Sequence, residues 1–94
     1  MKYMITWKIP PGSHKPAAEA FLASGAPNPA GVTTIGRWHL PGSARGWHLV
    51  ESEDGPALAQ GIAEWADVCE LELLPVIEDA EAASGLSKIY GSEE

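Results

Sequence analysis

The chain has 94 residues, 45% of them hydrophobic and 20% charged, which is the composition of one globular domain with a modest core. Its formal net charge is −7 and its six basic residues are scattered, which argues against nucleic acid or an anionic membrane surface as partners. The single cysteine, Cys69, excludes an internal disulfide, and the lack of a signal-like segment or a membrane-length apolar run favours a cytoplasmic location. We expect residues 1–94 to form one domain.

The first two predicted elements are a strand and a helix. Residues 2–9 alternate with a period of two, which predicts a β-strand that ends at Pro10. Ser13 is placed to cap a helix whose apolar stripe is formed by Ala17, Ala18, Phe21 and Leu22. Gly25 is placed to close that helix in the left-handed conformation.

A β-hairpin with a repeated dipeptide follows. Residues 32–40 and 47–51 have the pattern of β-strands, and a Pro-Gly turn signal lies between them. The dipeptide Trp-His occurs once in each strand, at 38–39 and at 47–48. In each strand the indole and the imidazole therefore lie on opposite faces.

The C-terminal half predicts a helix, a strand and a second helix. Asp54 and Pro56 open the first of these helices, whose buried face is formed by Leu58, Ile62 and Trp65. Residues 69–76 have the pattern of a fourth strand, in which Pro75 indicates an edge position or the end of pairing. Asp79 is placed to begin a short C-terminal helix, and the last four residues are expected to fray.

The order of these elements is β-α-β-β-α-β with an additional helix. It predicts a ferredoxin-like α+β fold, with a four-stranded antiparallel sheet and two helices on one face. The other face of such a sheet is left open.

The hydrophobic residues suggest which side chains face the helices. We expect Trp38 and Trp47 to lie on the covered side with Trp7, Leu71 and Leu73, and we expect Trp7, Trp38 and Trp65 to be mostly buried. The open face then carries Thr6, Lys8, Arg37, His39, His48, Glu70 and Glu72. A one-residue change of register would instead place Trp38 with His48.

Five of these polar residues are candidates for a ligand site: Lys8, Arg37, His39, His48 and Glu72. In the expected register His48 lies diagonally across from His39, within reach of one small ligand. A guanidinium beside an imidazole favours an anionic or enolate-like group, and a neutral imidazole accepts a proton, so Arg37, His39 and His48 are also the catalytic candidates. The alternative is a polar dimer interface or a solvated surface.

Metal and cofactor motifs are missing from the sequence. His39, His48 and Glu72 are metal-ligand types, but neither an H-x-x-x-H pattern nor paired cysteines accompanies them, so we predict no metal site. The sequence also contains no phosphate-cradling glycine loop, dinucleotide fingerprint or G-x-S-x-G elbow. We therefore predict no cofactor.

Several segments together resemble a known family: MKYMITWKI at the start, GVTTIGRWH at 31–39, HLVES, and AEWADVCELELLPVIED at 63–79. The family consists of short bacterial proteins and is known only as a domain of unknown function. It is similar to the dimeric α+β barrel superfamily, in which two ferredoxin-like sheets pack face to face. That superfamily includes cofactor-free quinol monooxygenases, haem-degrading monooxygenases, muconolactone isomerases and stress-responsive proteins.

The resemblance implies the fold and a homodimer through the open sheet face, where we also expect the apolar residues Met4, Ile35, Val50 and Leu74. It carries over no catalytic residue. Three functions remain open, and whether the chain is an enzyme is undecided. The first is binding of a small organic ligand, between helices and sheet or inside the barrel.

The second function is that of a cofactor-free monooxygenase or isomerase acting on an aromatic or enolisable substrate. His39 or His48 would then be the general base, and Arg37 or Lys8 would stabilise an oxyanion. The third is a structural or interaction dimer without a ligand.

Overall fold

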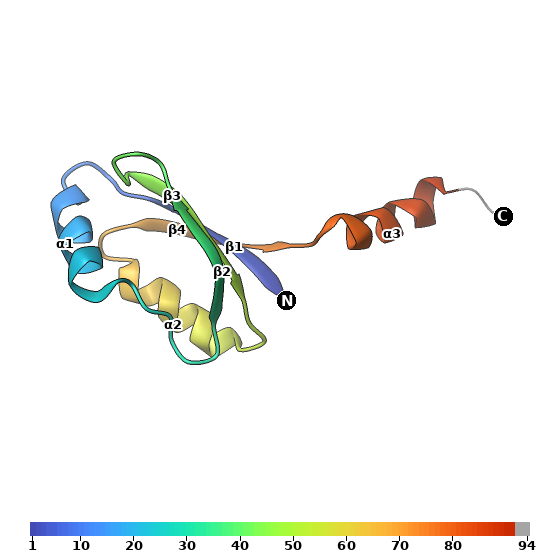
Figure 1. Ribbon diagram of the computed structural model, residues 1–94, viewed down its shortest axis with the longest axis horizontal. Helices are drawn as coiled ribbons and strands as arrows, with labels where there is room; N and C mark the ends of the chain where they lie inside the picture. The colour runs from blue at the N-terminus through green and yellow to red at the C-terminus, as the bar shows by residue number, and fades with distance from the viewer. Residues whose placement is uncertain (92–94) are drawn as a thin grey trace.

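A computed structural model describes residues 1–91 of the chain. Its elements are β1 (Lys2–Lys8), α1 (His14–Ser24), β2 (Thr33–His39), β3 (Arg45–Glu51), α2 (Gly55–Trp65), β4 (Glu70–Val76) and α3 (Asp79–Tyr90). The four strands form one antiparallel sheet in the order β2-β3-β1-β4, with α1 and α2 on one side of it (Figure 1). This is the predicted ferredoxin-like α+β fold. The expected fraying of the last four residues lies, beyond Gly91, outside the described residues.

Local signals in the sequence set several of the element ends. The Asp54 side chain accepts a hydrogen bond from the backbone N–H of Ala57 at 3.0 Å and so caps α2. Gly25 follows α1 with a φ of 71°, and its N–H donates to the carbonyl of Phe21. Pro75 lies on β4, which is an edge strand as predicted.

The tryptophans and histidines of the hairpin lie on the faces of the sheet opposite to those that we expected for them. Trp38 pairs directly with Trp47, so the two indoles do share a face. However, Trp7 pairs with Gly46, which places Trp47 on the face opposite to Trp7. The covered face therefore carries Arg37, His39 and His48 beside Trp7, Leu71 and Leu73. We call the other side the open face; its side chains include Met4, Thr6, Trp38, Trp47, Leu49, Glu72 and Leu74.

On each face of the sheet one indole ring covers a glycine, so the tryptophans are divided between the two faces and do not all lie on the covered one. A Cβ at Gly46 would overlap the ring of Trp7 on the covered face, and a Cβ at Gly36 would overlap the ring of Trp38 on the open face. Alternation in the sequence shows which residues share a face, but not which face the helices cover. The prediction of a buried Trp38 is wrong, because this side chain is 55% exposed.

A β-bulge in β2 changes the face of the residues before it. The register with β3 shifts between Thr34 and Gly36, which leaves Ile35 as the extra residue. Thr34 therefore lies on the covered face together with Arg37, although strict alternation would have placed it with Trp38. Val50, which was expected on the open face, pairs with Thr34 and is fully buried on the covered side.

The fully buried core is small. Its hydrophobic members are Ala17, Val50, Ala57 and Leu58. Larger side chains between the sheet and the helices, among them Trp7, Phe21, Ile62 and Trp65, are only partly buried. They line a cavity instead of filling the space between the two layers.

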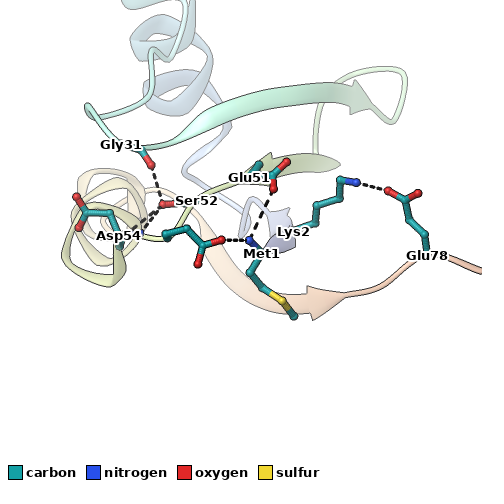
Figure 2. A network of polar contacts seen from close by, with 8 residues as sticks. Met1, Lys2, Gly31, Glu51, Ser52, Asp54 and Glu78 are labelled. Atoms are coloured by element: carbon teal, nitrogen blue, oxygen red, sulfur yellow. Dashed lines mark hydrogen bonds and ion pairs between the residues drawn. The ribbon is translucent and has the colours of Figure 1, made fainter. Parts of the chain in front are cut away.

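A polar network ties the end of β3 to its neighbours (Figure 2). The hydroxyl of Ser52 donates to the carbonyl of Gly31 at 2.7 Å, and the backbone N–H of Asp54 donates to the same hydroxyl at 3.0 Å. The Met1 amino group pairs with two glutamates at this end of the sheet, Glu51 and Glu53. The loop before β2, the start of β1 and the start of α2 are thereby held together.

The segment 77–90, which we call the arm, extends away from the rest of the fold (Figure 1). It consists of Ile77, Glu78 and α3. The radius of gyration is 16.4 Å, whereas a compact domain of this length has about 12 Å. The longest dimension of the chain, 58 Å, is correspondingly large. The expected C-terminal helix is present, but it does not pack on its own domain.

Candidate functional site

A cavity of about 410 Å³ lies between the covered face of the sheet and the helices α1 and α2. Its walls are mostly apolar and include Trp7, Phe21, Ile62, Trp65 and Leu71. Sites for small organic ligands have volumes of about 300–1,000 Å³ and a few well-placed polar groups in apolar surroundings. We call this cavity the cleft; Arg37, His39 and His48 are among its polar lining residues.

Arg37 contributes a cation to the cleft. Its guanidinium donates to the carbonyls of Gly25 at 3.3 Å and Ala26 at 2.8 Å, just beyond the C-terminal end of α1. Burial lowers the pKa of Arg37, but a guanidinium stays protonated at neutral pH. Within residues 1–91 no carboxylate lies within 4.0 Å of it. Two of the five donor hydrogens are used by these carbonyls, which leaves others for a ligand.

His48 is the directly paired neighbour of Arg37 on β3. It is only 8% exposed, and its Nε2 lies 2.7 Å from the hydroxyl of Thr34. Burial, reinforced by the positive charge of Arg37, lowers the pKa of His48 to about 4. The imidazole is therefore neutral at pH 7.

The hydrogen bonds of the Thr34 hydroxyl bear on which nitrogen of His48 carries the hydrogen. The side-chain amide of Asn28 donates to the Thr34 hydroxyl oxygen at 2.7 Å. The Thr34 hydroxyl can then donate its single hydrogen to Nε2, and in this tautomer the ring hydrogen of His48 is on Nδ1. Among residues 1–91 Nδ1 has no hydrogen-bond partner. In that tautomer His48 offers an N–H donor beside the cation of Arg37.

His39 belongs to the aromatic part of the cleft. Its ring meets Trp7 and Phe21 edge-on, with centroid separations of 5.0 Å and 5.4 Å. Its Nδ1 lies 3.0 Å from the hydroxyl of Ser43 in the hairpin loop. As expected, His48 lies diagonally across from His39, because His39 pairs with Gly46, but both are on the covered face.

Lys8 and Glu72 do not join this group. Both lie on the open face, where Lys8 pairs with Arg45 and Glu70, and Glu72 accepts a long hydrogen bond from Thr6 at 3.4 Å. The sheet therefore separates Lys8 from the histidines that it was expected to assist. It also separates Glu72 from the histidines with which it could have shared a metal ion.

The sequence did not single out three residues that shape the cleft. Thr34 and Asn28 fix the orientation of His48, and the Nε2–H of His14 donates to the carbonyl of Gly42 at 2.8 Å, which ties α1 to the hairpin. Thr34 lies on the covered face only because of the bulge in β2. That bulge depends on the pairing of β2 with β3, which the sequence alone does not reveal. Asn28 and His14 lie in a loop and at a helix start with no local pattern that marks them.

The described residues contain neither of two other kinds of structure. Within residues 1–91, no three His, Cys, Asp or Glu side chains lie together as a metal-ligand group. In the same range, none of the helices has the length and apolar character needed to cross a membrane.

Comparison with known families identifies the chain. The model of DUF3303, described as a domain of unknown function, matches residues 1–90. The chain belongs to the DUF3303 family. A search of curated proteins gives no match. Membership in DUF3303 agrees with the resemblance to an uncharacterised family, and the description of that family names no activity.

Proposed function

We propose that this DUF3303 protein binds a small aromatic anion in the cleft. The observation that carries the proposal is the side-by-side position of Arg37 and His48 within a mostly apolar cavity of about 410 Å³. A partly buried cation without a carboxylate partner favours an anion at that position. The Nδ1–H of His48 would add a second donor to the same group.

The walls of the cleft support an aromatic body for the ligand. Trp7, Phe21 and His39 form an edge-to-face cluster on one side of the cavity, and Ile62 and Trp65 come from α2. Aromatic groups favour such edge-on and offset contacts with other rings. A flat apolar ligand with one negative charge therefore suits both the walls and the polar pair.

The geometry supports binding better than catalysis. The low pKa of His48 and the contact of its Nε2 with Thr34 make this imidazole a hydrogen-bond donor through Nδ1 and a weak base. Lys8 lies on the open face, away from any oxyanion in the cleft. An enzyme would depend on His39 as its base and on Arg37 as its cation.

Two dyes that differ in one charged group test the proposal. The anion 8-anilinonaphthalene-1-sulfonate and the neutral N-phenyl-1-naphthylamine share the same aromatic body. We expect the parent chain to bind both dyes, and Arg37→Met to weaken binding of the sulfonate roughly tenfold, which is about 1.4 kcal/mol, without changing binding of the neutral dye.

Matched controls keep the dye experiment decisive. Lys8→Met removes a cation from the open face and should leave both affinities unchanged. Arg37→Lys keeps the charge and should retain part of the preference for the sulfonate. Equal loss of both dyes in Arg37→Met would show that Arg37 only shapes the cleft, and unchanged sulfonate binding would show that no anion site is there. Either result overturns the proposal.

We also propose that two copies form a homodimer in which the open face of each protomer is buried, the face that the dimeric α+β barrel superfamily also uses. This face carries apolar side chains that no layer of the described residues 1–91 covers, and Trp38 and Leu74 are 55% and 45% exposed. Contiguous exposed apolar surface of this kind is typical of interfaces. Light scattering at micromolar concentration should give twice the chain mass of 10.0 kDa, and a mass of one chain would contradict the proposal.

A further inference from the structure

The arm has an apolar side that nothing in residues 1–91 covers. Leu86, Ile89 and Tyr90 are 60%, 73% and 83% exposed, and no residue of α3 is buried. Ala82, Leu86 and Ile89 follow one another at helical spacing, so they share one side of the helix. An amphipathic helix of this kind normally lies with its apolar side against another surface.

A helix of this length needs such a surface. α3 has 12 residues, and isolated helices shorter than about 12–15 residues are marginal in water. Its charges do suit its dipole, with Asp79 and Glu81 in the first turn and Lys88 in the last. These electrostatic contributions to the stability of the helix are small beside the contribution of packing its apolar side. The arm therefore needs contact with another surface to be a stable helix.

The arm is badly placed to cover its own sheet. Only Ile77 and Glu78 separate β4 from α3, and Glu78 has extended backbone angles. Lys2, at the start of β1, pairs with the Glu78 carboxylate and orients this short link (Figure 2). The arm consequently leaves the domain in a direction away from the body of the fold (Figure 1).

The same chain has a second uncovered surface with the matching chemistry. The open face presents Trp38 and Leu74 to solvent, and Lys8 and Arg45 lie directly opposite each other on β1 and β3. In the described part of the chain neither of these cations has an ion pair. Asp79 lies two helical turns before Leu86, on the same side of α3, and is likewise unpaired there.

We propose that the arm of each protomer lies across the open face of its partner, so that two arms are exchanged within one dimer. The apolar side of α3 would cover Trp38, Leu49 and Leu74 of the second copy, and the carboxylate of Asp79 would approach its cations. This inference rests on the proposed homodimer and adds to it the element that makes the contact.

An exchange between identical chains doubles the area that one arm and one open face can bury. Stable interfaces bury about 1,200–2,000 Å² in total. A two-fold dimer would contain two such contacts, each between one arm and one open face, and full burial of one large aromatic side chain covers about 150–250 Å². Tyr90 and Trp38, each present twice, would supply a large part of this area together with the leucines and isoleucines. Because each chain carries both the arm and a surface that suits it, a second copy of the same chain supplies both halves of the interface.

Sedimentation velocity of the full chain tests this directly. We expect the parent to be a dimer. The double variant Leu86→Asp, Ile89→Asp should raise the dissociation constant of the dimer roughly a hundredfold, because anchor positions of the interface lose their apolar side chains. Ser84→Asp, on the opposite side of α3, is the matched control and should remain as dimeric as the parent. Circular dichroism of each variant should show the β-sheet unchanged.

The sedimentation results distinguish failure of the exchanged arms from failure of the proposed homodimer. A monomeric parent would refute both. A dimeric parent whose Leu86→Asp, Ile89→Asp variant is equally dimeric would refute only the role of the arm.

Disulfide trapping identifies the surface that the arm contacts. In a Cys69→Ser background, chains with Ile89→Cys are mixed with chains with Leu49→Cys and mildly oxidised. The proposal predicts a disulfide between these two kinds of chain, and none when Ser84→Cys replaces Ile89→Cys. Cross-links formed only between two Ile89→Cys chains would show that arm pairs with arm, which would overturn the proposal.

Discussion

On the covered face of the sheet, Trp7 lies over Gly46 beside the polar pair of Arg37 and His48; on the open face, Trp38 lies over Gly36 and is 55% exposed. The two arrangements use the same indole-over-glycine contact, yet one forms the wall of a cleft and the other forms an outer surface. The difference comes from α1 and α2, which cover only one side (Figure 1). Neighbouring elements, and not the polarity of the strand residues, decide which side of this sheet is the interior.

The largest predicted effect is the difference in stability loss between alanine substitutions of Trp7 and of Trp38. Trp7→Ala should destabilise the chain by roughly 3 kcal/mol at every protein concentration, because it empties a site inside one protomer. Trp38→Ala should cost less than about 1 kcal/mol in a dissociated protomer and more where the dimer is populated, because its contacts are then between chains. Urea unfolding at several protein concentrations measures both. Equal and concentration-independent losses would remove the distinction between the faces.

The next effect concerns the pH dependence of stability through His48. Its pKa is about 4 in the fold and near its ordinary value of 6.5 when unfolded. Above pH 6.5 both states are neutral; as the pH falls from 6.5 to 4, only the unfolded state takes up the proton, so the fold loses stability. At about 1.4 kcal/mol per pKa unit this loss reaches about 3 kcal/mol and then levels off below pH 4.

His48→Gln isolates this contribution from the carboxylates that also titrate in acid. The free energy of unfolding of parent and variant, measured in urea between pH 7 and pH 4, should differ by an amount that changes with pH in that window. A pH-independent difference would mean that His48 is solvated and that the covered face does not bury it.

A smaller difference is expected between the two glycines under the indoles. Gly46→Ala forces Trp7 to move within a packed layer, and overpacking of this kind costs typically about 1–3 kcal/mol. Gly36→Ala only displaces Trp38 toward solvent, so we expect a cost below about 1 kcal/mol. Thermal unfolding of both variants compares them. The reverse order would show that Trp38 is the better packed of the two rings.

The smallest effect is predicted for the open-face carboxylate. Glu72→Gln should change the affinity for 8-anilinonaphthalene-1-sulfonate by less than about twofold, since an exposed charge on the far side of the sheet is well screened. His48→Gln at pH 7 should weaken the same affinity several-fold, because it removes the Nδ1–H donor. A titration by fluorescence measures both variants, and a larger effect of Glu72→Gln would place the dye on the wrong face.

Local chemistry made the order of the elements predictable. Asp54 caps α2 and Gly25 ends α1 through contacts with residues only three or four positions away. The faces of the hairpin were not predictable in this way, because they depend on Trp7 pairing with Gly46 across β1 and β3 and on the bulge at Ile35. Arg37, His39 and His48 were identified as a group from spacing alone, but the helices determine that they line a cleft.

We propose above that Arg37 and His48 form the polar part of a ligand site on the covered face. A crystal structure of the chain with 8-anilinonaphthalene-1-sulfonate tests it most directly. We expect the dye within the cleft, with its sulfonate within hydrogen-bond distance of the Arg37 guanidinium and of Nδ1 of His48. A sulfonate held instead by Lys8 and Arg45 on the open face, with the cleft lacking dye, would show that the ligand site is not on the covered face.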